Sequence, residues 1–264
     1  MGAVDGANGS DVLLELEDVH IYFGKVVALA GVNTKIFNGE IHSIIGPNGA
    51  GKTSLLNCIS GFYHPNQGEI YYRNHNLTKS SPHQVSRLGI ARAFQNIELF
   101  SGMTVLDNLM LARHRHLRYN LFQAVWYFSK AARIESENRA YVEDIIDFME
   151  LEPYRKRFVG SLSYGIQKRV EVARAMTLGP RLLLLDEPMA GMNVEEKEDM
   201  VRFIMDIQKE RQITVVLVEH DLGVVMDISD RVDVLDYGEL IGSGTPETVA
   251  RDPKVVEAYI GDEG

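Results

Sequence analysis

The stretch Gly46-Pro-Asn-Gly-Ala-Gly-Lys-Thr53 decides the fold, because it matches the phosphate-binding pattern G-x-x-x-x-G-K-[ST]. It follows the apolar run Ile41-His-Ser-Ile-Ile45 and precedes the helix-like run Ser54-Leu-Leu-Asn-Cys-Ile59. This is the strand-to-helix turn where the curled backbone can point several N–H groups at one anion. The residues expected to hold the phosphates of a nucleotide are Gly46, Pro47, Asn48, Gly49, Ala50, Gly51, Lys52, Thr53 and Ser54.

Charged and hydroxyl groups of this loop have separate tasks. We expect Lys52 to reach the β- and γ-phosphates and Thr53 to offer its hydroxyl to Mg²⁺. A second motif, Leu182-Leu-Leu-Leu-Asp-Glu-Pro188, ends an apolar run with two adjacent carboxylates. Asp186 is expected to hold Mg²⁺ through water, and Glu187 to polarise the water that attacks the γ-phosphate. A plain turn after a strand would explain the second motif alone, but not its pairing with a phosphate loop.

Short apolar runs without alternation predict strands covered on both faces, as in a mainly parallel sheet flanked by helices. Besides the run before the phosphate loop, these are Arg181–Leu185 and Ile213–Val218. Three further runs predict strands of an antiparallel β edge: Val12–Val19, Val26–Phe37 and Gly68–Asn74. The predicted fold class is therefore α/β, a P-loop NTPase core with an antiparallel β edge subdomain and a helical subdomain.

The helical subdomain is indicated by the loss of strand signals from Met103 to Leu151. Thr104 and Asp107 are spaced as a capping box at the start of its first helix. Its section 114–140 carries the single Trp126 among aromatic and basic residues. This section either packs onto its own domain, which we favour, or forms an amphipathic hairpin that binds a partner.

These patterns predict the following domain organisation. Residues 1–10 form a flexible tail, residues 11–96 with 179–264 form the nucleotide-binding core with its β subdomain, and residues 97–178 form the helical subdomain, which contains an insertion at 113–140.

Composition excludes several classes of protein. The 264 residues are 45% hydrophobic and 24% charged, which excludes general disorder. With 27 basic and 37 acidic residues the net charge is −10, which argues against a nucleic-acid partner. The longest apolar runs fall far short of the roughly 20 residues that cross a bilayer as a helix, and the first ten residues do not resemble a signal peptide. The one cysteine, Cys58, is expected to be a core thiol.

The segment Ser163-Tyr-Gly-Ile-Gln-Lys-Arg-Val-Glu-Val-Ala-Arg-Ala175 makes the sequence recognisable, because it resembles the signature segment of ATP-binding cassette (ABC) proteins. In that family the segment starts a helix and contacts the ATP held by a second subunit. The resemblance assigns this role to Ser163, Tyr164, Gly165 and Gln167, and a helix start does offer N–H groups and a favourable dipole to an anion.

The resemblance places three more residues. Gln95, in Phe94-Gln95-Asn96, is expected to sense Mg²⁺ and the attacking water and so joins the metal site and the catalytic set. His220 is expected to contact the γ-phosphate and steady Glu187, so the catalytic set is Glu187, His220, Lys52 and Gln95. Phe23, or its neighbour Tyr22, is expected to stack on adenine.

Two residues depart from the common family pattern. Tyr164 stands where most members have Gly, and Asn193 stands where many have Asp. Both changes concern contacts with the second ATPase subunit rather than the catalytic set, so an active ATPase is expected.

Further segments resemble one subgroup, the ATP-binding subunits of branched-chain amino-acid importers that carry the longer insertion. They are Arg92–Phe100, Met103–Leu109 and Asp236–Glu247, with the end of the chain to Gly261. The resemblance implies ATP and Mg²⁺ as cofactors, and as partners a second ABC ATPase subunit, two membrane permease subunits and, indirectly, a solute-binding protein. It implies a cytoplasmic protein, peripheral on the inner face of the cell membrane.

Two other function classes are weaker. A non-transport ABC ATPase of DNA repair or of ribosomes usually has a long coiled coil or two cassettes in one chain; this chain has neither. A P-loop kinase or small-molecule transferase would leave the signature segment and His220 unexplained.

Overall fold

The computed structural model describes residues 12–95, 97–114 and 128–260. The chain divides into two compact units, Met1–Val85 with Met205–Gly264 and Ser86–Ile204. The predicted tail 1–10, Asn96 and residues 115–127 of the predicted insertion, with Trp126, lie outside the described residues.

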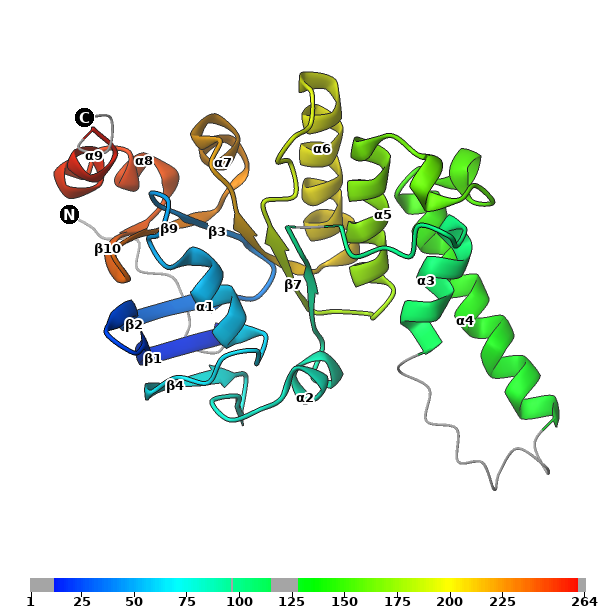
Figure 1. Ribbon diagram of the computed structural model, residues 1–264, viewed down its shortest axis with the longest axis horizontal. Helices are drawn as coiled ribbons and strands as arrows, with labels where there is room; N and C mark the ends of the chain where they lie inside the picture. Colours follow the sequence, from blue (N-terminus) through cyan, green and yellow to red (C-terminus); the bar gives the residue numbers. More distant parts are fainter. Residues whose placement is uncertain (1–11, 96, 115–127, 261–264) are drawn as a thin grey trace, which may run out of the picture. The chain divides into compact units, whose positions relative to one another are not determined.

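An antiparallel sheet of the first unit contains the three predicted edge strands (Figure 1). Its order is β2-β1-β4-β5. The strands are β1 (Val12–Phe23), β2 (Val26–Phe37), β4 (Gln67–Tyr72) and β5 (His75–Asn76). β1 extends four residues beyond the predicted Val19, to Phe23. Its apolar residues on one face, such as Leu14 and Leu16, are buried, as expected of a sheet with one covered face.

A second layer of the first unit carries the phosphate loop. β3 (Ile41–Ile45) pairs in parallel with β8 (Thr214–Val218) and with β9 (Arg231–Asp236), and β10 (Glu239–Gly244) pairs antiparallel with β9. Every residue of β3 and β8 is buried, which confirms the prediction from their unbroken apolar runs.

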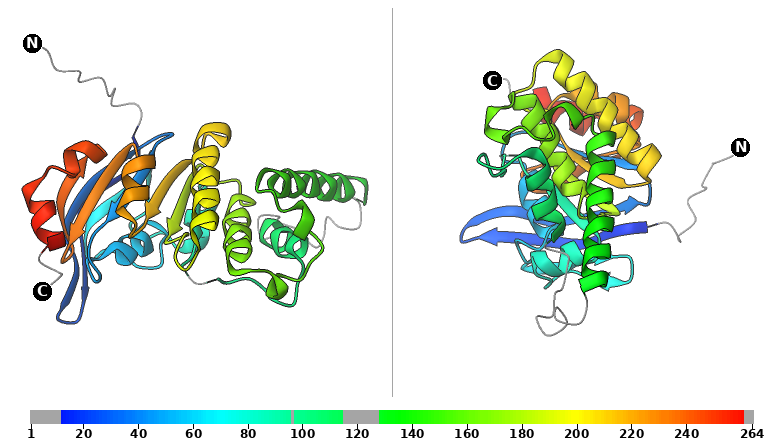
Figure 2. Two further views of the ribbon diagram at one scale, coloured as in Figure 1. Left: turned by 90° about the horizontal axis from the view of Figure 1, so that it is seen from above. Right: turned by 90° about the vertical axis from the view of Figure 1, so that its right-hand side faces the viewer.

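Helices complete the first unit. α1 (Lys52–Ile59) follows the phosphate loop, α7 (Leu222–Ile228) follows β8, and α8 (Pro246–Val249) and α9 (Pro253–Ile260) end the described chain. The left view of Figure 2 shows α8 and α9 beside β9 and β10. Cys58 on α1 is buried, and its burial raises the pKa of the thiol to about 12, so the predicted core thiol is confirmed.

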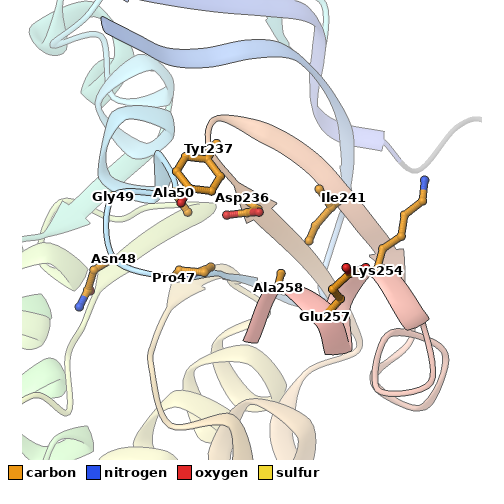
Figure 3. A pocket seen from close by; sticks show the side chains of 10 residues that line it. All are labelled: Pro47, Asn48, Gly49, Ala50, Asp236, Tyr237, Ile241, Lys254, Glu257 and Ala258. Carbon is orange, nitrogen blue, oxygen red and sulfur yellow. The ribbon is translucent and has the colours of Figure 1, made fainter. Parts of the chain in front are cut away.

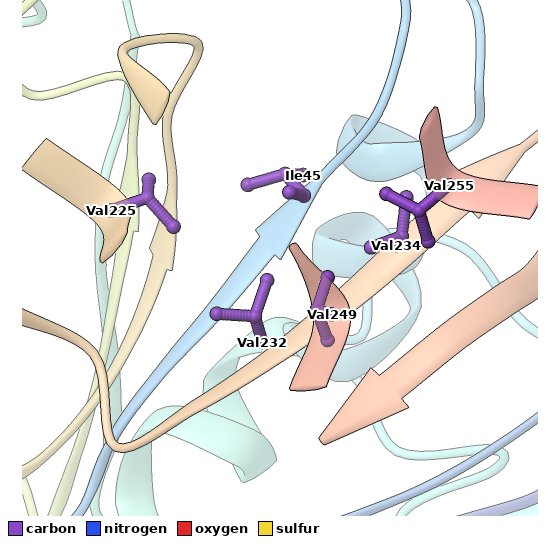
Figure 4. Packing of buried hydrophobic residues seen from close by; sticks show 6 residues of the cluster. All are labelled: Ile45, Val225, Val232, Val234, Val249 and Val255. Atoms are coloured by element: carbon purple, nitrogen blue, oxygen red, sulfur yellow. The ribbon is translucent and has the colours of Figure 1, made fainter. Parts of the chain in front are cut away.

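A valine-rich cluster joins these elements into one core (Figure 4). Its members come from β3, α7, β9, α8 and α9 and are Ile45, Val225, Val232, Val234, Val249 and Val255. Leu222, Met226, Ile241 and Tyr259 pack against it. Each fully buried side chain of this size contributes roughly 1.5–3 kcal/mol, so the C-terminal helices are fixed to the strand that leads into the phosphate loop.

A buried ionic cluster lies on the same strand. Nδ1 of His42 lies 2.9 Å from Oε1 of Glu40, and Nε2 lies 2.9 Å from Oδ2 of Asp233 on β9. Thr34 on β2 donates a hydrogen bond to the same oxygen of Asp233. Burial alone would lower the pKa of His42, but the hydrogen bonds to Asp233 and Glu40 outweigh burial and raise the pKa to about 9. His42 is therefore a buried imidazolium that ties β3 to β9.

This cluster predicts an alkaline loss of stability. Because the pKa of His42 is higher in the folded state, the stabilisation is complete below the unfolded value of about 6.5 and is lost as the pH rises through about 9. The free energy of unfolding, measured with urea, should fall between these two pH values. His42→Gln should lower stability at pH 6 and flatten this decline, whereas His75→Gln, at an exposed position, should leave the profile unchanged. An equal alkaline slope in His42→Gln would contradict the assignment.

The second unit contains a parallel strand pair, β6 (Ile90–Ala93) and β7 (Leu182–Asp186), and a group of helices. α3 (Val105–His114), α4 (Phe128–Phe148) and α5 (Tyr164–Met176) lie side by side (Figure 1). Two short 3₁₀ turns, Glu152–Tyr154 and Val159–Ser161, precede α5. α2 (Pro82–Arg87) and α6 (Val194–Arg211) each cross from one unit to the other along the chain.

The predicted capping box is present at the start of α3. Asp107 donates its N–H to Oγ1 of Thr104 over 3.1 Å, and the Thr104 hydroxyl donates to Oδ2 of Asp107 over 2.6 Å. Helices replace strands from Val105 to Phe148 wherever the chain is described, as predicted. Within the described ranges, no helix has the length and apolar character needed to cross a membrane.

Candidate functional site

The phosphate loop begins directly after β3 and continues into the first turn of α1. Its glycines adopt positive φ angles of 148° at Gly46 and 105° at Gly51, which L side chains rarely adopt. Nζ of Lys52 donates to the carbonyl oxygens of Gly46 over 2.6 Å and Pro47 over 2.9 Å. The lysine is therefore folded back over the loop, with its ammonium group bound to the loop backbone.

The β9–β10 hairpin hydrogen bonds with the phosphate loop and supports it. Gly238, between β9 and β10, donates its N–H to the carbonyl oxygen of Ala50 over 2.9 Å and accepts a hydrogen bond from Ala30 on β2 over 2.8 Å. The backbones approach so closely that a Cβ on Gly46 would lie 2.0 Å from the carbonyl oxygen of Leu235 on β9. The curvature of the loop is thus fixed by neighbouring strands as well as by its own glycines.

A cavity of about 450 Å³ lies between the loop and α9 (Figure 3). It is lined by loop residues, the β9–β10 hairpin and α9: Pro47, Asn48, Gly49, Ala50, Asp236, Tyr237, Ile241, Lys254, Glu257 and Ala258. Next to it, burial raises the pKa of Tyr259 to about 12, and a hydrogen bond with the Gly46 backbone partly offsets this rise. The C-terminal helix therefore contacts the phosphate loop directly.

Two other expected residues of the first unit lie on its surface. Phe23, at the end of β1, is 48% exposed and packs edge-on against Tyr63, with ring centroids 5.1 Å apart. The hydroxyl of the alternative, Tyr22, hydrogen bonds with Nδ1 of His20 over 2.9 Å. His220 follows β8 in an exposed position, and its N–H donates to Oε2 of Glu219 over 3.2 Å.

Asp186 ends β7 in the second unit and is only 3% exposed. Its Oδ2 accepts a hydrogen bond from Arg92 on β6 over 2.7 Å. Its other oxygen, Oδ1, is buried and has no hydrogen-bond partner among the described residues. A buried carboxylate oxygen without a partner fits a hydrated Mg²⁺, which is bound through oxygen and retains several waters.

Glu187 and Gln95 are brought together at the carboxyl ends of neighbouring parallel strands. Nε2 of Gln95 donates to Oε2 of Glu187 over 2.5 Å. Glu187 has φ 49°, a left-handed conformation that costs a non-glycine residue about 1–3 kcal/mol. The turn after β7 holds the carboxylate in this position, so the strain is consistent with a functional residue.

The signature residues surround the start of α5. Ser163 caps the helix, and its Oγ accepts the N–H of Ile166 over 3.5 Å. The Tyr164 ring is exposed and lies over Gly191, where a Cβ would be 3.2 Å from the ring. Gly165 is buried against the carboxylate of Glu196, and the Gln167 side chain donates to the carbonyl oxygen of Leu162 over 2.9 Å.

Asn193 has a local structural role. Its Oδ1 accepts the N–H of Glu196 over 2.9 Å, and its own N–H donates to Oε2 of Glu196 over 3.2 Å. This reciprocal arrangement is a capping box at the start of α6. Asn and Asp cap helices almost equally well, so Asn in place of Asp preserves the fold at this position.

Sequence reasoning missed two cations of the site, Arg92 and Lys168. Arg92 binds Asp186, and Lys168 on α5 donates to the carbonyl oxygens of Gln95 over 2.5 Å and Glu187 over 3.5 Å. A signal was present for Arg92, because a charged residue within the strand-like run Ile90–Ala93 has to find a partner.

The expected Mg²⁺ ligands are Thr53, which is exposed at the start of α1, with Gln95 and Asp186 in the second unit. Elsewhere in the described chain, no group of three or more His, Cys, Asp and Glu residues could form a separate metal site. Hydroxyl, amide and carboxylate oxygens are each ligands of the kind that a hard cation such as Mg²⁺ prefers.

Comparison with known protein families gives two matches. Residues 29–190 match a family described as ABC transporter, and residues 239–264 match one described as branched-chain amino acid ATP-binding cassette transporter.

Two curated relatives align over nearly the whole chain. The chain is 39% identical to the high-affinity branched-chain amino acid transport ATP-binding protein BraF of Pseudomonas aeruginosa, over 95% of this chain and 98% of the relative. It is 38% identical to LivG of Escherichia coli, which has the same description, over 96% and 99%.

Solved structures of ABC transporter cassettes are also similar to this chain. A nucleotide-free ATP-binding cassette from an ABC transporter superposes with a TM-score of 0.82 at 32% identity, covering 95% of this chain and 99% of that one. An ADP-bound cassette of an ABC transporter gives 0.83 at 33%, with the same coverage. A dimeric bacterial ABC transporter cassette gives 0.74 at 27%, covering 89% and 99%.

Proposed function

The chain belongs to the ABC transporter family, and we propose that it is the ATP-hydrolysing subunit of an importer for branched-chain amino acids or related small solutes. Membership confirms the family resemblance, the α/β fold class and the ATPase activity predicted from the motifs. The nearly full-length similarity to BraF and LivG supports the substrate class.

The proposed ATP hydrolysis is supported mainly by the pairing of Gln95 with Glu187, next to Asp186. The Gln95 amide donates to Oε2 of Glu187 and so orients the carboxylate that polarises water, whereas Asp186 keeps a buried oxygen for a hydrated cation. Two adjacent carboxylates in different surroundings thus take the two tasks that phosphoryl transfer to water requires, orienting the nucleophile and placing the metal.

In this proposal, the N–H groups of the loop from Gly46 to Ser54 bind the phosphates of ATP, and Phe23 stacks on adenine. Mg²⁺, when bound at Thr53, Gln95 and Asp186, neutralises charge on the β- and γ-phosphates. Lys52 exchanges its loop carbonyls for phosphate oxygens, and His220 contacts the γ-phosphate. Glu187 polarises the attacking water, and the cations stabilise the charge that develops on the transferring phosphoryl group.

Partners complete the site. Ser163, Tyr164, Gly165 and Gln167 contact ATP held by a second ABC ATPase subunit, so that two subunits close on two nucleotides. Two membrane permease subunits, docked near Gln95 and the 97–115 segment, convert closure into transport, and a solute-binding protein acts through them. In this proposal the chain is cytoplasmic and peripheral on the inner face of the membrane.

Affinity purification of the tagged full-length chain from detergent-solubilised membranes tests the proposal. We expect membrane permease subunits and a second ABC ATPase subunit to co-purify in amounts comparable to the chain. A soluble preparation should contain no nucleic acid, as the net charge of −10 predicts. Recovery of ribosomes or nucleic acid without permeases would favour the alternative, a non-transport ABC ATPase.

A further inference from the structure

The ammonium group of Lys168 is buried in the second unit, close to the signature residues, to Gln95 and to Glu187. Lys168 belongs to α5, just after the signature residues, and is only 2% exposed. A buried cation is costly unless hydrogen bonds compensate for the lost water. Strong hydrogen bonds to Nζ of Lys168 are therefore expected.

Backbone carbonyls provide these contacts. Nζ of Lys168 donates to the carbonyl oxygen of Gln95 over 2.5 Å and lies 3.5 Å from that of Glu187. Gln95 and Glu187 are the residues whose side chains meet over 2.5 Å. The ammonium group of Lys168, on α5, therefore binds the backbones of both Gln95 and Glu187.

The backbone of Glu187 needs such support. Its φ of 49° is unfavourable for a residue with a side chain, so the turn is held in place by its surroundings. A small backbone rotation at Glu187 or Gln95 would separate Oε2 from Nε2 and redirect the carboxylate, and a misplacement of about 1 Å can cost roughly 100-fold in rate.

A second cation of α5 reinforces the same connection. Arg174 donates through Nη1 to the carbonyl oxygen of Glu98 over 2.9 Å and through Nη2 to Oε1 of the buried Glu171 over 2.6 Å. The segment from Gln95 to Glu98 is thus bound to α5 at both ends through its carbonyl oxygens. A movement of α5 would be passed to Gln95 directly.

We propose that Lys168 is a positioning residue for ATP hydrolysis, which connects the signature helix to the Gln95–Glu187 pair by holding both backbone carbonyls. The proposal rests on the proposed role of Glu187 and assigns to Lys168 no contact with the nucleotide.

Steady-state hydrolysis of Mg-ATP by the full-length chain tests the proposal with three variants. Lys168→Met keeps the length of the side chain and removes the donors; we expect kcat to fall about 10- to 100-fold, with KM changed less than about threefold. Lys168→Arg restores charge and donors and should recover most of the lost kcat. Lys156→Met, at an exposed position of the same unit, is the matched control and should behave as the parent chain.

Binding and stability separate positioning from a merely structural role. The affinity for a fluorescent ATP analogue should be the same in Lys168→Met and the parent chain. If Lys168→Met does not yield folded protein, Lys168→Gln is measured in its place. A fall in kcat with little change in KM then supports the positioning role in the same way. An unchanged kcat, a proportional loss of nucleotide affinity, or an equal loss in Lys168→Met and Lys168→Arg would each overturn the proposal.

Glu187→Gln, assayed in parallel, distinguishes this proposal from the proposed function. If Glu187→Gln abolishes hydrolysis while Lys168→Met does not reduce it, only the role of Lys168 is wrong. If neither change reduces hydrolysis, the role of Glu187 is wrong, and the role of Lys168 is overturned with it.

Discussion

Glu187→Gln should reduce Mg-ATP hydrolysis by about 10²- to 10⁴-fold, the range expected when a general base is removed. The substitution keeps the size of the side chain, and the amide oxygen can still accept the hydrogen bond that Nε2 of Gln95 makes with Oε2 of Glu187. The geometry is therefore retained and the negative charge that polarises water is lost. Because Lys52 and the loop N–H groups are untouched, ATP should still bind and hold two subunits together.

The measurement is phosphate release by the purified full-length chain, together with its size in solution with and without ATP. We expect little turnover and a dimer of the purified chain that persists in ATP. Glu198→Gln, an exposed position on α6, is the matched control and should hydrolyse ATP normally. Near-normal hydrolysis by Glu187→Gln would show that another group activates the water.

Among Gly-to-Ala substitutions in the phosphate loop, Gly46→Ala should lower stability and nucleotide binding the most. The new Cβ would lie 2.0 Å from the carbonyl oxygen of Leu235, and Gly46 has φ 148°, so the loop or β9 has to move. Strain and overpacking together should cost about 3 kcal/mol or more of unfolding free energy. The shift also displaces the loop N–H groups that are proposed to bind the phosphates, so we expect nucleotide affinity to fall at least about tenfold.

Urea unfolding and binding of a fluorescent ATP analogue measure the two effects. Gly39→Ala is the matched control, because Gly39 has φ 82° and nothing within 4 Å of its Cβ position. It should cost only the backbone strain of about 1–2 kcal/mol and leave nucleotide affinity unchanged. If Gly46→Ala were no more destabilising than Gly39→Ala, the close approach of β9 to the loop would not be a constraint.

Most strands and the start of α3 could be predicted from the order of apolar and polar residues along the chain, because neighbouring residues determine these elements. The apolar runs at Ile41–Ile45 and Ile213–Val218 became the buried strands β3 and β8, and Val26–Phe37 became β2 with the same bounds. The spacing of Thr104 and Asp107 correctly placed the start of α3. In each case, the residues that determine the element are neighbours in the sequence.

Interactions between distant residues could not be predicted in the same way. His42 and Arg92 are polar residues inside apolar runs, which indicates that each has a partner, but the sequence does not say that these are Asp233 and Asp186. Lys168 gave no such signal, because its partners are backbone carbonyls, which every residue carries. The brace of the phosphate loop by Gly238 is also made by backbone atoms alone.

The positions of Gln95, His220 and Ser163 came from family resemblance rather than from local physics. Within the second unit, the pairing of Gln95 with Glu187 has a simple origin, since both residues follow neighbouring parallel strands and such strands end at the same edge of a sheet. Parallel pairing, once known, would have predicted that contact.

Uptake of radiolabelled leucine, isoleucine and valine by cells that lack this chain tests the central claim most directly, namely that ATP hydrolysis at Glu187 drives import. The account predicts that deletion of the chain reduces uptake, that the parent chain restores it, and that Glu187→Gln, produced at the same level, does not. Uptake that is unaffected by the deletion, or restored equally by Glu187→Gln, would contradict it.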